Sequence, residues 1–176
     1  MSFFFSPKDC QYIIQNLFLP NEIYEAIEEI DLEKLYEKGY RTVFLDVDNT
    51  ILTYEQREVP LDKLSWIQKV KGIGFRVFLI SNNSGKRRIQ RIAKQLQMIG
   101  VYFALKPSTL AVRELADDHF VDLTKTIFIG DQLLKDVVAG NWVKAHTILV
   151  NPIDIRNSLL KTVQREIELF LLKKLQ

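Results

Sequence analysis

The chain has 176 residues, 47% of them apolar, which is enough for one domain with a sizeable core and too few for two comfortable ones. Its formal net charge of +2 gives no overall field that would favour nucleic acid as a partner. The single cysteine, Cys10, excludes an internal disulfide, and no apolar run approaches the roughly 18 to 20 residues of a membrane-spanning helix. The N-terminus lacks a secretory signal pattern, so we expect a cytoplasmic protein.

The first 39 residues are predicted to form a helical lead-in, with helices at 9–18, 22–30 and 32–38. From residue 42, short apolar runs alternate with amphipathic stretches. The runs predicted to be strands are 42–45, 75–80, 101–104, 127–129 and 147–150. The helices are expected between them at 61–71, 86–98 and 108–119, with one more ending near residue 141.

This alternation predicts a three-layer, Rossmann-like α/β sandwich with a central, mainly parallel sheet. We divide the single domain into the lead-in (1–39), a core (42–150) and a C-terminal segment (151–176) whose last helix begins at Ser158. Residues 51–60 are of mixed charge and are expected to form a short exposed flap.

The end of the first core strand carries an unusual group of polar residues. Alternation places Asp46 and Asp48 on the same side of an extended chain, where two carboxylates repel each other unless a cation lies between them. Mg²⁺ suits so small a set, because it prefers one or two carboxylates together with water and phosphate oxygens. The alternative is a simple turn, with Thr50 capping the next segment.

Three further strands also finish in reactive residues: Ser81, Lys106 and Asp131, the last followed by Asp136. The separations of 35, 25 and 25 residues along 46, 81, 106 and 131 are each about one strand-helix-strand repeat. Ligands of open α/β sheets bind at the carboxyl ends of the strands, so we expect all four segments to face one site.

Over residues 42–150 the chain resembles the phosphatases of the haloacid dehalogenase (HAD) superfamily. The resemblance rests on four motifs in order, namely Asp46-x-Asp48-x-Thr50, the apolar run ending in Ser81, Lys106, and Gly130-Asp131 with Asp136. It implies that Asp46 is the nucleophile that forms an aspartyl-phosphate and that Asp48 is the general acid and base.

The resemblance also implies a site for Mg²⁺, held by Asp46, the main-chain carbonyl of Asp48 and Asp131, with Asp136 in support. Lys106 would hold the nucleophile and the phosphate by charge. The residues implied to bind the substrate are Thr50, Ser81, Asn82 and Asn83.

Neither position where HAD enzymes insert a cap domain has room for one, so an open site and a bulky substrate are expected. The chain more closely resembles branch IIIA of the superfamily, the YqeG type, which is related to mitochondrial phosphatidylglycerophosphate phosphatases. The resemblance rests on the motif segments 46–52, 81–83 and 106–107, on Gly130-Asp131-Gln132 with Gly140-Asn141, and on 147–152. This similarity implies hydrolysis of phosphatidylglycerophosphate to phosphatidylglycerol. The alternatives are a soluble phosphomonoesterase acting on a sugar, nucleotide or protein phosphate, and a non-catalytic HAD-like binding protein.

A lipid substrate would require peripheral contact with the inner face of the membrane. Phe3, Phe4 and Phe5 or the basic tail from Ser158 could supply it; the favoured alternative for the tail is that its apolar stripe packs on the sheet. The basic residues at 86–88 and Arg91 follow Ser81 and could steer an anionic surface. The alternative for this cluster is an ordinary solvated helix start.

Overall fold

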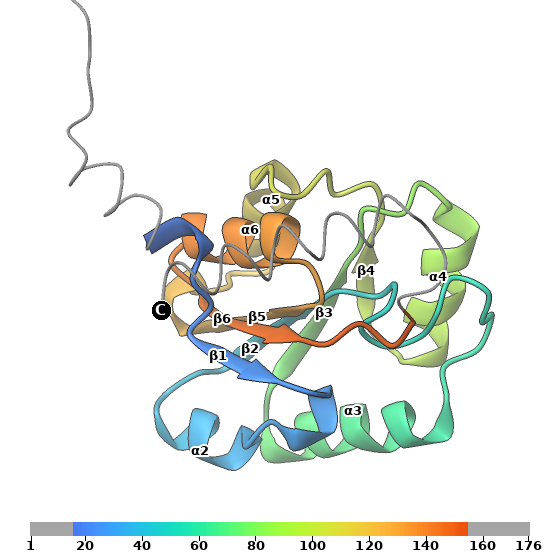
Figure 1. Cartoon of the computed structure of the whole chain (residues 1–176), viewed down its shortest axis with the longest axis horizontal. Coiled ribbons are helices and arrows are strands. Elements are labelled where there is room, and N and C mark those ends of the chain that lie inside the picture. The colour runs from blue at the N-terminus through green and yellow to red at the C-terminus, as the bar shows by residue number, and fades with distance from the viewer. Residues whose placement is uncertain (1–15, 155–176) are drawn as a thin grey trace, which may run out of the picture.

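The computed structural model describes residues 16–154 of the chain. Their centre is a six-stranded sheet in the order β1-β6-β5-β2-β3-β4, in which every neighbouring pair is parallel (Figure 1). The strands are β1 (Glu22–Tyr24), β2 (Thr42–Leu45), β3 (Arg76–Ile80), β4 (Ile99–Val101), β5 (Thr126–Gly130) and β6 (His146–Val150). The expected α/β sandwich with a parallel sheet is confirmed.

The longer helices are α2 (Leu32–Glu37), α3 (Leu61–Ile73), α4 (Lys86–Gln95) and α5 (Leu110–Asp118). The shorter pieces are the 3₁₀ turns η1 (Ile27–Glu29) and η2 (Leu123–Lys125), the π-helical turn η3 (Leu133–Val137) and α6 (Val138–Trp142). The predicted helices at 61–71, 86–98 and 108–119 therefore correspond to α3, α4 and α5, with ends that differ by a few residues.

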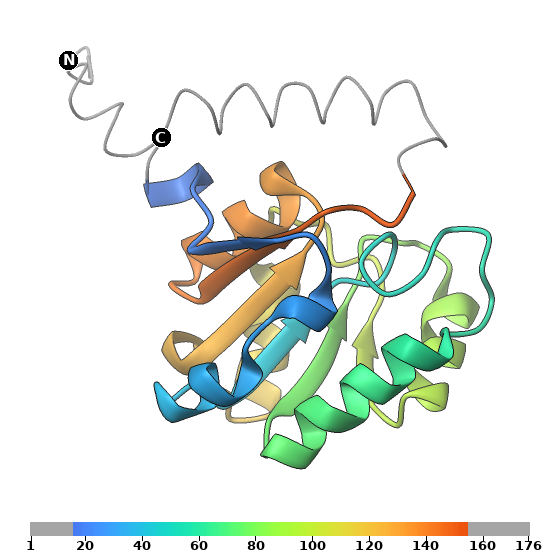
Figure 2. The same cartoon turned by 60° about the horizontal axis from the view of Figure 1, so that its bottom comes forward.

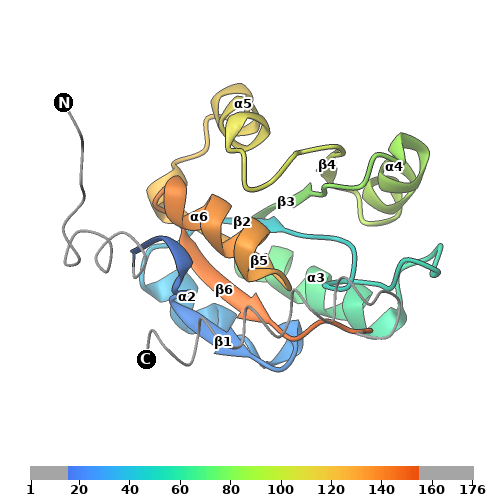
Figure 3. The ribbon, with the colours of Figure 1, turned by 45° about the horizontal axis from the view of Figure 1, so that its top comes forward.

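The alternation of side chains along β2 separates two hydrophobic layers. Val43 and Leu45 pack in one buried cluster with residues of α2, α3 and α4, and Figure 2 shows α2 and α3 across this face. Phe44 points the other way and meets Phe78 and Phe128 edge-on, in a cluster covered by α5 and α6 (Figure 3). Because both faces are covered, the strands are mostly apolar, and their polar residues stand mainly at the first positions.

The predicted helix at 22–30 is wrong. Residues 22–24 form the edge strand β1, paired in parallel with β6, and only the turn η1 remains helical. Hydrogen bonds to β6, which is distant in the sequence, hold this strand in place. Asn21, just before β1, donates its main-chain N–H to the Thr147 carbonyl at 2.9 Å, and its Oδ1 accepts from the Thr147 N–H at 2.7 Å. Such long-range pairing overrides local helical preference.

The strand expected at 101–104 is also misplaced. β4 lies at Ile99–Val101, and residues 102–106 form a loop that leads to α5. In this loop Phe103 and Leu105 have positive φ angles of 53° and 56°, which an extended strand does not allow.

The core at 42–150 lies entirely within the described residues and contains no inserted cap domain. Residues 53–58 form a short loop that is mostly exposed, as expected for the flap, whereas Ile51 and Leu52 are buried. No helix within residues 16–154 has the length and apolar character required to cross a bilayer. Cys10, most of the predicted helix at 9–18, and the membrane contacts predicted for Phe3, Phe4 and Phe5 and for the tail from Ser158 lie outside the described residues.

Candidate active site

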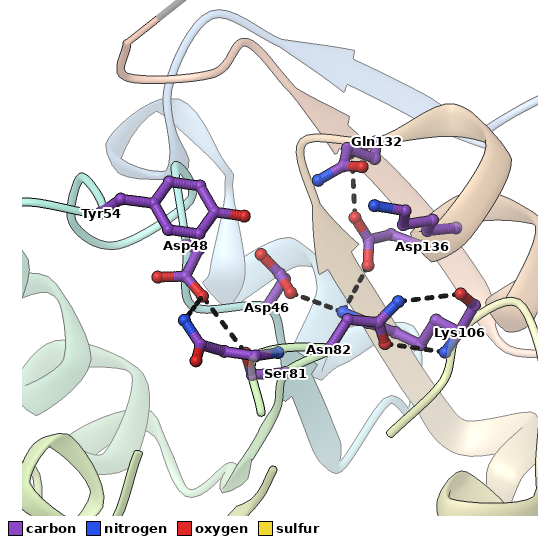
Figure 4. A pocket seen from close by; sticks show the side chains of 10 residues that line it. Asp46, Asp48, Tyr54, Ser81, Asn82, Lys106, Gln132 and Asp136 are labelled. Carbon is purple, nitrogen blue, oxygen red and sulfur yellow. Dashed lines mark hydrogen bonds and ion pairs between the residues drawn. The ribbon is translucent and has the colours of Figure 1, made fainter. Parts of the chain in front are cut away.

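The polar ends of β2, β3 and β5 and the loop after β4 meet at the carboxyl edge of the sheet, where they line a small pocket of about 20 Å³ (Figure 4). Its lining residues are Asp46, Asp48, Tyr54, Ser81, Asn82, Asn83, Lys106, Gln132, Lys135 and Asp136. Asp131 is buried beside them and lies in one acidic group with Asp46 and Asp136. The four predicted segments therefore converge.

The turn after β2 brings two carboxylates to the pocket. Asn49 has a φ of 68°, and its N–H donates to the Leu52 carbonyl at 2.8 Å, which closes the chain on itself directly after Asp48. Asn is one of the few residues that adopt this left-handed conformation readily. The segment is thus a turn, as the simpler alternative proposed, and the turn places the acidic residues in the site.

Lys106 lies between two buried carboxylates. Its Nζ donates to Asp46 Oδ1 at 2.5 Å, lies 2.6 Å from Asp136 Oδ1, and also donates to the Ile80 carbonyl at 2.7 Å. All three charged side chains are almost completely buried. Burial opposes its charged form, but the carboxylates of Asp136 and Asp46 outweigh burial and raise the pKa of Lys106, so the ammonium stays charged.

Three carboxylates share this one lysine. Carboxylate oxygens of Asp46, Asp131 and Asp136 all lie within 4.8 Å of one another, and Asp131 Oδ1 is buried without a hydrogen-bond partner. Burial and the neighbouring carboxylates raise the pKa of Asp131, and burial, only partly offset by Lys106, raises that of Asp46 to about 7. An excess of buried negative charge with oxygen ligands fits a divalent cation such as Mg²⁺.

Asp48 faces the opposite wall of the pocket. Its Oδ2 accepts from Asn83 Nδ2 at 3.0 Å and from Ser81 Oγ at 3.4 Å (Figure 4). Arg88 Nη2 lies 2.9 Å from its Oδ1. The Asp48 side chain is therefore held by groups from the loop after β3 and from α4, whereas Asp46 is held by Lys106. The two carboxylates of the first motif have different partners.

Two of the residues expected to bind substrate make other contacts. Asn82 clamps the main chain of Lys106, donating to its carbonyl at 2.9 Å and accepting from its N–H at 2.7 Å. Thr50 is buried, and its Oγ donates to Asp46 Oδ2 at 3.4 Å. Both contacts position the charged pair Lys106–Asp46, and a direct role of either side chain toward substrate stays a prediction.

Arg88 was expected only as part of a surface cluster, and the structure brings it into the site. Besides Asp48, it donates to the main-chain carbonyls of Thr53 and Gln56, so it ties the flap to α4. Tyr54 of the flap lines the pocket as well, and burial with the nearby carboxylates raises its pKa to about 12. Neither residue belongs to the four motifs, so the sequence offered no direct signal for them.

Gly130 explains how Asp136 comes so close to the strand end. A Cβ at this position would lie 2.3 Å from Asp136 Cγ, so only glycine leaves room for the carboxylate. Asp136 also accepts from the Gln132 N–H at 3.0 Å, which folds the segment after β5 back on itself. Packing therefore requires glycine at position 130 where Asp136 lies against the strand end.

Comparison with known proteins places this site in a family. The chain is 30% identical over 164 residues to the probable phosphatase YqeG of Bacillus subtilis, and the match covers 93% of this chain and 95% of that protein. The chain belongs to the YqeG-type phosphatases of the HAD superfamily. As a member of this family it is a phosphoric monoester hydrolase.

Further matches agree with this assignment. Residues 104–161 match the HAD-hydrolase-like family model. The chain is 28% identical to the chloroplastic and mitochondrial phosphatidylglycerophosphate phosphatase 1 of Arabidopsis thaliana, over 95% of this chain but only 49% of the plant protein.

Solved structures show the same fold at low sequence identity. An uncharacterised Listeria monocytogenes protein superposes with a TM-score of 0.53 at 14% identity, over 76% of this chain and 99% of that one. The cobalt-bound deoxy-D-mannose-octulosonate 8-phosphate phosphatase YrbI of Haemophilus influenzae gives 0.51 at 16% identity, over 81% and 90%. The HAD-like fold of this YqeG-type chain is thus confirmed.

Proposed function

We propose that this YqeG-type phosphatase hydrolyses a phosphate monoester in two steps through a phosphoryl group carried on Asp46. The observation that carries the proposal is the separation of roles around the two carboxylates. Asp46 is buried and held by Lys106 at 2.5 Å, while Asp48 is held on the other wall by Ser81, Asn83 and Arg88. One carboxylate is thus fixed for attack and the other for proton transfer.

In the first step an Asp46 oxygen bonds to phosphorus and the bond from phosphorus to the ester oxygen breaks. The leaving alkoxide takes a proton from Asp48. In the second step water attacks the phosphorus, Asp48 accepts the water's proton, and Asp46 is released together with inorganic phosphate. In this proposal the Ser81 hydroxyl would donate to a phosphoryl oxygen, and the Lys106 ammonium would offset the negative charge of the phosphoryl group.

The acidic group fits Mg²⁺, which Asp46, Asp131 and the main-chain carbonyl of Asp48 would hold. When bound, the cation supplies the charge that lets an anionic phosphate approach a carboxylate. Asp136 lies 2.6 Å from Lys106, which supports a role in orienting the lysine. Its Oδ2 accepts from the Gln132 N–H, so this carboxylate already has partners on both sides.

For the substrate we propose phosphatidylglycerophosphate, hydrolysed to phosphatidylglycerol. Two findings support this choice: the similarity to the plant phosphatase that is named for this lipid, and a site that no cap domain covers. A pocket as small as about 20 Å³, with no cap domain over it, leaves the body of a large substrate outside. Peripheral contact with a membrane is part of this proposal.

The test has two parts. Purified protein should hydrolyse p-nitrophenyl phosphate only with Mg²⁺, and Asp46→Asn should remove this activity, whereas the exposed control Asp117→Asn on α5 should keep it. Full activity of Asp46→Asn would refute the nucleophile. A panel that compares phosphatidylglycerophosphate in vesicles with sugar and nucleotide phosphates then tests the substrate. Faster turnover of the soluble phosphates would reject the lipid.

A further inference from the structure

Beside the catalytic pocket lies a second, larger hollow, with a volume of about 330 Å³. It is lined by Tyr54, Glu55 and Arg57 of the flap and by Arg88 and Arg91 of α4. We call it the arginine groove. Asp48 pairs with Arg88, so the excess of positive charge in the groove comes from Arg57 and Arg91, which outnumber the carboxylate of Glu55.

Two of the three arginines have no hydrogen-bond or ion-pair partner within the described residues. Arg88 is paired with Asp48, but within residues 16–154 Arg57 and Arg91 form no hydrogen bond or ion pair, and both are exposed. Arg91 follows Arg88 at the i+3 position of α4, so the two side chains emerge on the same face of the helix. Like charges gathered without partners repel one another, and an anion bound between them would relieve this repulsion.

The groove opens beside the catalytic pocket. Tyr54 lines both hollows, and the Arg88–Asp48 pair, at 2.9 Å, joins a lining residue of the groove to a lining residue of the pocket. Figure 4 shows Tyr54 directly beside Asp48. A small molecule whose phosphoryl group lies at Asp46 would therefore extend past Tyr54 toward the arginines.

We propose that the arginine groove is a second anion site, which binds the phosphodiester of a substrate whose phosphate monoester lies at Asp46. This inference rests on the proposed function, and it names the part of the substrate that gives selectivity. Guanidinium groups bind phosphate oxygens in a bidentate manner and keep their charge at all physiological pH values. Phosphatidylglycerophosphate carries its monoester and its diester on one short glycerol unit, and simple monoesters lack the diester.

The test compares two substrates in the full-length protein with Mg²⁺: short-chain phosphatidylglycerophosphate below its critical micelle concentration, and p-nitrophenyl phosphate. In the double variant Arg57→Gln/Arg91→Gln, we expect the ratio of kcat/KM for the lipid to that for p-nitrophenyl phosphate to fall about tenfold or more, mainly through KM. The control Arg87→Gln removes an exposed arginine of α4 that does not line the groove, and it should keep the wild-type ratio.

A direct competition measurement supports the comparison. Glycerophosphoglycerol carries the diester without the monoester, so it should inhibit p-nitrophenyl phosphate hydrolysis by the wild type and inhibit the double variant more weakly. Because both replaced side chains are exposed and unpaired in the described structure, the double variant should unfold at the wild-type temperature.

The outcomes separate the two proposals. If the wild type hydrolyses neither substrate, the proposed function fails. If it hydrolyses both and the ratio is the same in the double variant, only the arginine groove is rejected. An effect seen only in vesicles that contain other anionic lipids would also reject it, because the arginines would then bind neighbouring head groups rather than the substrate's own diester.

Discussion

Lys106 and Asp46 are 60 positions apart in the sequence, yet the lysine Nζ donates to Asp46 Oδ1 at 2.5 Å. The contact joins the loop after β4 to the end of β2, and both side chains are almost completely buried. A buried ion pair of this kind makes folding depend on the site, since loss of either partner leaves a charge without compensation. Catalytic geometry and stability are coupled at this point.

We therefore expect Lys106→Met to destabilise the fold by about 3–5 kcal/mol and to lower turnover of p-nitrophenyl phosphate by about 100-fold or more. The carboxylates of Asp46 and Asp136 would lose their shared cation. Urea unfolding and steady-state kinetics measure the two effects. Lys135→Met is the matched control, because Lys135 also lines the pocket but is only half-buried. Equal destabilisation by both variants would show that the ion pair is unimportant.

Mg²⁺ should stabilise the folded protein through Asp131. At a concentration of about 100 times its Kd, an ion that binds only the native state contributes about 2.7 kcal/mol. This stabilisation should raise the Tm of the wild type. We expect Asp131→Asn to abolish the rise, because the variant lacks the carboxylate whose Oδ1 has no hydrogen-bond partner in the protein and would bind the ion. Without Mg²⁺ the same variant should be at least as stable as the wild type, since the neighbouring carboxylates repel each other. A thermal scan with and without Mg²⁺ decides the point, and an unchanged Mg²⁺ response would exclude Asp131 as a ligand.

Gly130→Ala should damage the site through packing alone. The added methyl group would lie 2.3 Å from Asp136 Cγ, so Asp136 must move, and overpacking of this kind costs about 1–3 kcal/mol. Activity should fall as well, because Asp136 holds Lys106. The control Gly72→Ala adds a methyl group near the end of α3 where nothing lies within 4 Å, and it should stabilise the protein by up to about 1 kcal/mol. Unfolding of the two variants in urea checks the contrast.

Most of the site was predicted from the polar residues that follow the predicted strands. Buried parallel strands are nearly continuous apolar runs, so β2, β3, β5 and β6 were found within a few residues, and their polar ends had to share one edge of the sheet. The convergence of Asp46, Ser81, Lys106 and Asp131 followed from this.

Elements whose structure depends on distant partners were not predicted. β1 has three residues and becomes a strand through β6 and the Asn21–Thr147 contacts. Arg88 enters the site because the flap folds against α4 and offers the carbonyls of Thr53 and Gln56. Neither arrangement leaves a pattern in the local sequence. Gln132 and Lys135, in contrast, could have been predicted to line the pocket, because they lie between the motif residues Asp131 and Asp136.

The last prediction concerns acid stability at the opposite edge of the sheet, where β1 and β6 begin. His146 Nε2 lies 3.0 Å from Glu22 Oε1, and Tyr40 contacts the other ring nitrogen at 3.2 Å. Burial lowers the pKa of His146 below 6.5, although Glu22 partly opposes this. Burial alone would raise the pKa of Glu22, but its hydrogen bonds with Tyr24 and His146 lower it below 4.5.

The lowered pKa values of His146 and Glu22 both make the folded protein less stable in acid. A group whose folded pKa is lowered binds protons more tightly when unfolded, so its stabilisation is present above the unfolded pKa and is lost as the pH falls through the folded one. The His146 contribution should therefore decline below pH 6.5, and that of Glu22 below pH 4.5. The raised pKa values of Asp46 and Asp131 act in the opposite direction. A comparison with His146→Gln cancels their effect, because both proteins contain them. The free energy of unfolding in urea, measured at several pH values, should fall more steeply for the wild type than for His146→Gln just below pH 6.5, and parallel curves would assign the acid sensitivity to other groups.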